Sequence, residues 1–155
     1  MGRSAFSMIE FDEAPRGLTR LIYASRSTET NVATLADSVR AILVKSIHNN
    51  RMADITGFLV CGGDRFLQLL EGPAGEVEST FGRIRQDSRH ADVAVIDKAP
   101  AERRMFRDWN MAQHQVTAAD QPLLAQAGLA TFTPDVLDEA GAIKIMSTLG
   151  GRYLR

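Results

Sequence analysis

Two strand-like runs near the middle of the chain are joined by a tight turn, and this pair limits the folds that are open to it. Residues 55–61 and 65–70 are rich in β-branched, aromatic and other apolar residues, and Gly62-Gly63-Asp64 lies between them. Glycine and aspartate at such a point are typical of turns that join antiparallel strands. The sequence therefore predicts a β-hairpin around which the other elements are arranged.

A strand and a helix are expected before the hairpin. Residues 18–25 are rich in strand-favouring residues and end in a polar run, which predicts a first, central strand. Thr34 followed by Asp37 resembles a capping box, and apolar residues then recur at helical spacing. The polar residues 48–50 weaken helix propagation, so the first helix is predicted to end there.

A second helix and two further strands are expected after the hairpin. Pro73 stands where the first residue of a helix is favoured, and an apolar stripe continues to Asp87. Residues 93–96 and the aromatic run 105–111 are predicted as strands. The resulting order of elements is typical of a ferredoxin-like α+β fold, in which a mixed sheet carries two helices on one face.

The chain of 155 residues fits one globular domain with an extension. Residues 1–16 are predicted to be a flexible N-terminal arm, and residues 17–113 to be the folded domain. Residues 114–155 are predicted to form a C-terminal helical extension, with helices over 122–129 and 134–149. This length leaves no room for an output enzyme domain, so we expect a stand-alone protein.

Composition narrows the possible partners. The 18 Lys and Arg nearly balance the 19 Asp and Glu, which provides no general attraction to nucleic acid or to an anionic membrane. Cys61 is the only cysteine, so no internal disulfide can form and we expect a cytoplasmic protein. No apolar segment is long enough to span a bilayer. His48, His90 and His114 stand too far apart in sequence for a metal-binding motif.

Gln68 interrupts the apolar run of the second hairpin strand. A buried amide without partners costs roughly 1 to 3 kcal/mol, so a glutamine here needs a group to bind. Strand alternation allows Gln68 to face solvent, but Phe66 and Leu70 would then share that outer face. Their apolar character favours the covered face. Other polar residues stand where apolar ones would be less costly: Tyr23, Ser46, Asn49 and Asn50.

Six separated motifs resemble, in order and spacing, those of the BLUF family of blue-light sensors using FAD, over about residues 17–113. They are Leu21-Ile22-Tyr23-Ala24-Ser25, residues 46–50, Ile55-Thr56-Gly57-Phe58-Leu59, residues 66–72, Asp87-Ser88-Arg89-His90 and residues 103–111. The motif that runs from Phe66 to Gly72 is the most distinctive.

The resemblance implies that FAD is held non-covalently between the two helices. Tyr23 matches the family's electron-donating tyrosine and Gln68 the glutamine that links it to the flavin. Asn50 matches the asparagine that binds the pyrimidine edge of the ring, and Asn49 a position beside the ring. Light would move an electron and a proton from Tyr23, and Gln68 would change its orientation or tautomer.

Further roles follow from the same resemblance. Trp109 and Met111 match the last-strand residues that exchange contacts near Gln68, and the motif leaves open which of them faces inward. Arg89 and His90 match a pair near the flavin's side chain and phosphate region, although a solvated charge at a helix end would look the same. The remaining residues expected to contact the cofactor are Ser25, Ile42, Ser46, Leu59, Phe66, Ile84 and Asp87.

The expected function is therefore that of a blue-light photoreceptor without catalytic turnover. It would bind FAD, with FMN or riboflavin possible in a recombinant preparation, and would signal through protein contacts to a downstream partner. Self-association into a homo-oligomer is expected from the resemblance. Two alternatives remain open: a flavin-dependent redox enzyme, and a cofactor-free ferredoxin-like interaction module.

Overall fold

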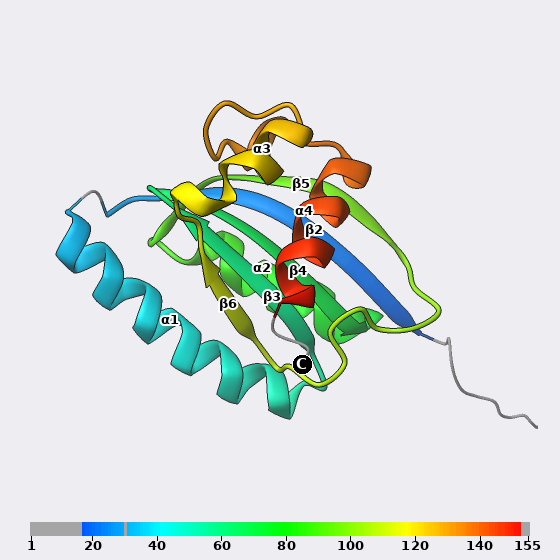
Figure 1. The fold of residues 1–155 in the computed structure, drawn as a ribbon. Helices are drawn as coiled ribbons and strands as arrows, with labels where there is room; N and C mark the ends of the chain where they lie inside the picture. The colour runs from blue at the N-terminus through cyan, green and yellow to red at the C-terminus, as the bar shows by residue number, and fades with distance from the viewer. Residues whose placement is uncertain (1–16, 30, 153–155) are drawn as a thin grey trace, which may run out of the picture.

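The structure is a computed structural model that describes residues 17–29 and 31–152; the predicted N-terminal arm, residues 1–16, lies outside the described residues. A five-stranded sheet with the strand order β5-β2-β4-β3-β6 forms its centre (Figure 1). The strands are β2 (Leu18–Ser27), β3 (Thr56–Gly62), β4 (Arg65–Pro73), β5 (His90–Pro100) and β6 (Ala112–Gln115).

The sheet is mixed, as the sequence predicts. Strand β2 lies inside the sheet and pairs antiparallel with β4 and β5, while β3 and β4 form the predicted antiparallel hairpin. Strand β6 runs parallel to β3 at the other edge. Gly63 takes a φ of 57° in the hairpin turn, where a residue with a Cβ would be strained. The predicted ferredoxin-like α+β layout is confirmed.

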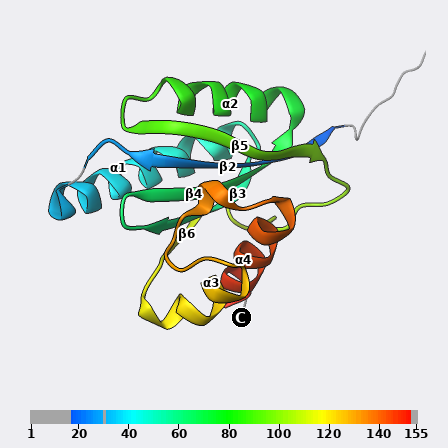
Figure 2. The same ribbon diagram turned by 90° about the horizontal axis from the view of Figure 1, so that it is seen from above.

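Helices cover both faces of the sheet (Figure 2). Helices α1 (Val32–Met52) and α2 (Ala74–Gln86) lie together on one face, which we call the cleft face. Helices α3 (Gln121–Gln126) and α4 (Glu139–Gly151) lie on the opposite face, which we call the far face. Short 3-10 turns precede each of the latter two helices, at Ala118–Asp120 and Pro134–Val136.

The predicted strand over residues 105–111 is wrong. These residues form bends and turns, and the last strand begins only at Ala112. The backbone N–H groups of Met105 and Phe106 donate to the side chain of Glu71 instead of to a neighbouring strand. The aromatic run is expected to form a strand, but it belongs to a connection between β5 and β6 whose rings pack into the core. We call residues 101–111 the crossover segment.

Several predicted boundaries also shift. Helix α1 begins at Val32, so Thr34 lies inside it and is not its N-cap, and α1 continues past residues 48–50 to Met52. Pro73 ends β4 and is the N-cap of α2.

The helix boundaries predicted for the C-terminal extension, 122–129 and 134–149, also differ from those in the structure. Helix α3 ends at Gln126, shortly before Gly128, which takes a φ of 82°. Helix α4 starts only at Glu139, because the side chain of Asp138 accepts a hydrogen bond from the Gly141 N–H and caps it.

Side chains of the central strands alternate between two apolar clusters, one on each face. On the far face, strand residues pack with α4: Ile22, Phe58, Val60, Leu67, Leu69, Ile145, Met146 and Leu149. On the cleft face, strand residues pack with the first two helices: Leu21, Tyr23, Leu59, Phe66, Leu70, Val77 and Phe81. Among the described residues, no helix is long and apolar enough to cross a membrane.

Candidate functional site

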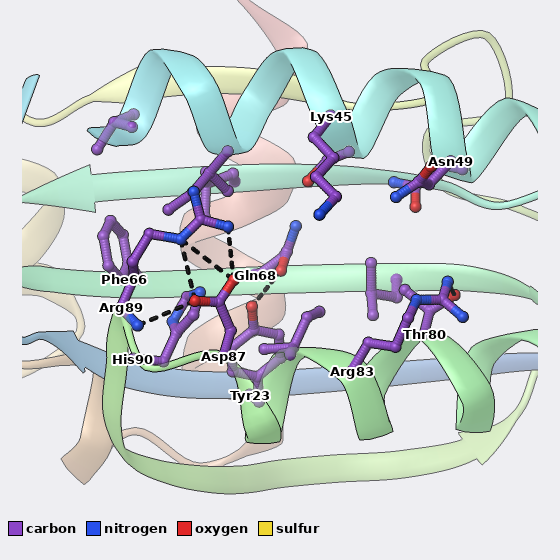
Figure 3. A pocket seen from close by; sticks show the side chains of 17 residues that line it. Tyr23, Lys45, Asn49, Phe66, Gln68, Thr80, Arg83, Asp87, Arg89 and His90 are labelled. Atoms are coloured by element: carbon purple, nitrogen blue, oxygen red, sulfur yellow. Dashed lines mark hydrogen bonds and ion pairs between the residues drawn. The ribbon is translucent and has the colours of Figure 1, made fainter. Parts of the chain in front are cut away.

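A cleft of about 140 Å³ opens between α1, α2 and the cleft face of the sheet (Figure 3). Its floor is made by β2, β3 and β4, and its two walls by the helices. Its lining mixes apolar side chains, amides and charged groups: Tyr23, Val39, Ile42, Lys45, Ser46, Asn49, Asn50, Leu59, Phe66, Gln68, Leu70, Thr80, Arg83, Ile84, Asp87, Arg89 and His90. This composition is typical of sites that hold a large planar ligand by its faces and its edges.

Tyr23 and Gln68 lie side by side on the floor of the cleft. The register of β2 and β4 places them directly opposite each other, and their exposed fractions are only 1% and 5%. The phenol of Tyr23 donates a hydrogen bond to Oε1 of Gln68. Burial raises the pKa of the Tyr23 phenol well above its ordinary value, and the nearby Cys61 and Asp87 raise it further. The prediction that Gln68 lies on the covered face is confirmed.

The other end of the Gln68 amide points to the crossover segment. Nε2 of Gln68 donates to the sulfur of Met111 at 3.3 Å, and Met111 belongs to the cluster on the cleft face. Trp109 packs on the far face, where its ring lies 5.6 Å from that of Phe106 with only 8° between the planes. Residues two apart would share one face of a strand, but this segment turns. The structure therefore directs Met111, and not Trp109, toward Gln68.

The last turns of α1 supply the amides of one wall. Ser46, Asn49 and Asn50 are spaced three and four apart, which places them on one side of the helix. Asn50 is 2% exposed, and its Nδ2 donates to the backbone oxygen of Asn110 at 2.9 Å. The Asn110 side chain in turn donates to the backbone oxygen of Ile55 at 3.1 Å. The end of α1 is thereby joined to the residue that precedes Met111.

Asp87, Arg89 and His90 close the end of the cleft nearest to Phe66 (Figure 3). The Arg89 guanidinium binds both carboxylate oxygens of Asp87, with Nη2 2.6 Å from Oδ2, and lowers the pKa of Asp87 to about 2. Burial lowers the pKa of His90, which favours its neutral form. Nδ1 of that imidazole lies 2.9 Å from the hydroxyl oxygen of Ser25.

Nearly all of the residues expected to contact a cofactor line this one cleft. Ser25 is the exception, since it is buried behind His90 and does not reach the cleft surface. The sequence reasoning missed a further set of lining residues: Val39, Lys45, Leu70, Thr80 and Arg83. Helical spacing could have found three of them, since Thr80 lies four residues before Ile84. Lys45 lies four residues before Asn49, and Arg83 lies four residues before Asp87.

The residues present fit a flavin. Val39, Leu59 and Ile84 offer apolar walls, and Asn49 and Gln68 offer amide groups of the kind that bind the polar edge of a ring. The described residues contain no group of three or more His, Cys, Asp and Glu that could hold a metal ion.

The fold and the cleft together define a small α+β cofactor-binding domain with a buried tyrosine–glutamine pair at the base of its site. Within that class, the chain belongs to the BLUF family, the sensors of blue light using FAD, whose family model matches residues 18–112.

Curated relatives carry the same domain within longer proteins. The photoactivated adenylate cyclase subunit beta of Euglena gracilis is 35% identical over 125 residues, which are 79% of this chain and 13% of that protein. The blue light- and temperature-regulated antirepressor BluF of Escherichia coli is 35% identical over 88 residues, which are 56% of this chain and 21% of that protein. The chain thus spans only a small part of the curated relatives that it matches.

Solved structures of similar size share the whole fold. BlsA in its photo-activated state superposes with a TM-score of 0.78 at 29% identity, covering 85% of this chain and 94% of that chain. The BLUF protein BlrB in its dark state gives a TM-score of 0.65 at 29% identity, covering 86% of this chain and 97% of that chain. These matches extend beyond the sheet into the C-terminal part of the chain.

Proposed function

We propose that this chain is a blue-light receptor whose photoactive centre is the hydrogen-bonded series Tyr23, Gln68 and Met111, with FAD in the cleft above it. The observation that carries the proposal is the buried hydrogen bond between Tyr23 and Gln68 on the cleft floor. A phenol and an amide that bind each other at the base of a ligand site can exchange hydrogen-bond partners while every covalent bond of the ligand stays intact. Such a change requires no conversion of a substrate.

A flavin held in the cleft by the residues that line it would supply the absorption of blue light and the electron acceptor, and the surrounding side chains would supply the electron and the proton. Tyr23 is the donor: its raised pKa makes loss of the proton before the electron unfavourable, so the electron leaves first or together with the proton. Gln68 Oε1 is the acceptor nearest to that proton. When Gln68 turns or changes tautomer, its Nε2 leaves Met111, and the return of electron and proton restores Tyr23. What persists is a changed set of hydrogen bonds.

FAD is favoured over riboflavin by two cations at the mouth of the cleft. Lys45 reaches in from α1 and Arg83 from α2, on opposite sides of the opening (Figure 3). Arg89 is already paired with Asp87 through two nitrogens, so it is less suited to a phosphate. We assign Lys45 and Arg83 to the diphosphate of FAD.

A titration tests this assignment. Lys45→Gln and Arg83→Gln are expected to weaken FAD binding several-fold each and to leave the affinity for riboflavin unchanged, since riboflavin carries no phosphate. Arg51→Gln is the matched control, because Arg51 is an exposed cation in the last turn of α1 away from the cleft lining. Equal losses for both ligands would contradict the assignment.

The function itself is tested by absorption. Protein with FAD bound should be yellow, should shift its absorption to the red in blue light and should recover in the dark without added reductant. Reduction by NAD(P)H with substrate turnover would instead favour the flavin-dependent enzyme. Colourless protein that takes up no added flavin would favour the interaction module.

We propose that output passes through protein contacts with a downstream partner. The two curated relatives named above are a cyclase subunit and an antirepressor, so the domain serves different outputs in different proteins. Gel filtration with light scattering, in the dark and under blue light, tests whether this chain forms a homo-oligomer and whether light changes its oligomeric state.

Cys61 is a buried free thiol, which agrees with a reducing, cytoplasmic compartment.

A further inference from the structure

The crossover segment spans the sheet from one edge to the other. It leaves β5 at one edge and enters β6 at the opposite edge, so it passes the ends of β2, β4 and β3 on the way. Such a connection carries backbone N–H groups that belong to no strand or helix. Where these N–H groups are buried, oxygen atoms of other residues must accept their hydrogen bonds.

Glu71 of β4 binds two of these groups. Its side chain is on the far face and is 0% exposed. Oε1 accepts from the Met105 N–H at 2.8 Å and from the Phe106 N–H at 3.2 Å. Oε2 accepts from Nε of Arg20 at 2.9 Å, and this ion pair compensates the buried negative charge. Arg20 also donates to the backbone oxygen of Arg103 at 3.2 Å.

The rest of the segment is fixed by bonds that run on from this anchor. Arg104 donates to the backbone oxygens of Glu71 and Asp54, at 3.1 and 2.9 Å. Three residues after Phe106, the backbone oxygen of Trp109 accepts from the Gly57 N–H at 3.0 Å. Met111 then reaches the Gln68 amide. Hydrogen bonds to the sheet therefore hold the crossover segment at residues 103–106 and again at Trp109, two residues before Met111.

Glu71 and Gln68 are three residues apart on β4, so they lie on opposite faces. Gln68 binds Met111 on the cleft face, while Glu71 holds the backbone of the same segment on the far face. A carboxylate suits the second task because it only accepts, whereas an amide would turn an N–H toward donors.

We propose that Glu71 is a positioning residue for the photoreaction: it holds the crossover segment so that Met111 meets Gln68 and Trp109 stays on the far face. The effect on the photoreaction rests on the function proposed above, whereas the positioning does not. Because the chain has a single tryptophan, Trp109 reports the position of the segment directly.

Glu71→Gln in the flavin-bound protein is the test. The Trp109 emission in the dark is expected to shift to the red and to become more accessible to acrylamide, and dark recovery is expected to change several-fold. Exchange of the Met105 and Phe106 amide protons should become faster by roughly tenfold or more, as expected for a lost buried hydrogen bond. Wild-type Trp109 emission and wild-type recovery in this variant would overturn the proposal.

Asp120→Asn is the matched control. Among the residues that the structure describes, Asp120 is the other buried carboxylate, 1% exposed, and it accepts from His114, Arg152 and a backbone N–H outside the crossover segment. This variant should lose stability but keep the Trp109 emission. An equal change in both variants would overturn a specific role for Glu71.

A measurement on the unaltered protein keeps the proposal testable if Glu71→Gln does not fold. The Met105 and Phe106 amides lie outside any helix or strand, yet they should exchange as slowly as those of the central strands. Fast exchange would overturn the anchor. A wild-type protein without a light response would remove the proposed function and leave the exchange result to decide the positioning alone.

Discussion

The amide nitrogen of Gln68 lies 3.3 Å from the sulfur of Met111, and this contact joins the floor of the cleft to the segment that leads into β6. The amide oxygen of the same side chain accepts from Tyr23. Both ends of Gln68 are thus engaged by the protein, one by a strong donor and one by a weak acceptor. A thioether is a poor hydrogen-bond acceptor, so the Met111 end is the one that is released at lower cost.

Gln68→Leu is expected to bind flavin but to lose the reversible red shift in blue light. Leucine nearly preserves the volume of the side chain but has neither the acceptor for Tyr23 nor the donor for Met111. Absorption spectra before and after illumination measure the outcome. A normal red shift in this variant would remove Gln68 from the proposed centre.

Tyr23→Phe should also keep flavin and lose the ordinary red shift, for a different reason. The ring remains to fill the floor of the cleft beside Phe81, 5.3 Å away between centroids, but the electron and proton donor is gone. The hydrogen bond to Gln68 is lost as well, which should destabilise the fold by roughly 1 kcal/mol. Transient absorption and urea unfolding measure the two effects, and an unchanged photoreaction would argue for another donor.

Met111→Leu is predicted to alter the rate of dark recovery several-fold without loss of flavin. The substitution nearly conserves volume, so its cost in stability should stay below about 1.5 kcal/mol, while the sulfur that accepts from Gln68 is removed. Met146→Leu is a control of the same chemistry in a residue that is 0% exposed on the far face. Dark recovery of Met146→Leu should be as fast as that of the wild type. If both variants recover alike, the sulfur plays no part.

The sequence alone could predict those parts of the molecule that depend on local pattern. The hairpin follows from its turn residues, and the cleft-face position of Gln68 follows from strand alternation with Phe66 and Leu70. The helical spacing of Ser46, Asn49 and Asn50 likewise predicts a shared wall. Each of these signals lies within a few residues of chain, where backbone geometry is regular.

The crossover segment could not be predicted in this way. Its aromatic run has the composition of a strand, but the partner of its backbone is Glu71, more than thirty positions earlier in the chain. That long-range contact replaces strand pairing, and with it the rule that Trp109 and Met111 share a face. Which of them meets Gln68 is decided by tertiary structure, on which a family motif in sequence carries no information.

The last prediction concerns acid stability and the Asp120 carboxylate. Burial alone would raise the pKa of Asp120, but hydrogen bonds from His114, the Thr117 N–H and Arg152 outweigh it and lower the pKa from 3.8 to about 2. A carboxylate with a lowered pKa in the folded state adds stability that is complete above its unfolded pKa. That stability is lost as the pH falls from about 4 to about 2.

The difference between the two pKa values corresponds to roughly 2 kcal/mol in the free energy of unfolding. Asp120→Asn should therefore be less stable than the wild type at pH 7, and the difference in the free energy of unfolding between the two proteins, measured by urea denaturation, should narrow by about that amount as the pH approaches 2. A gap that stays constant from pH 7 to pH 2 would mean that the charge of Asp120 contributes nothing to the attachment of β6 to α4.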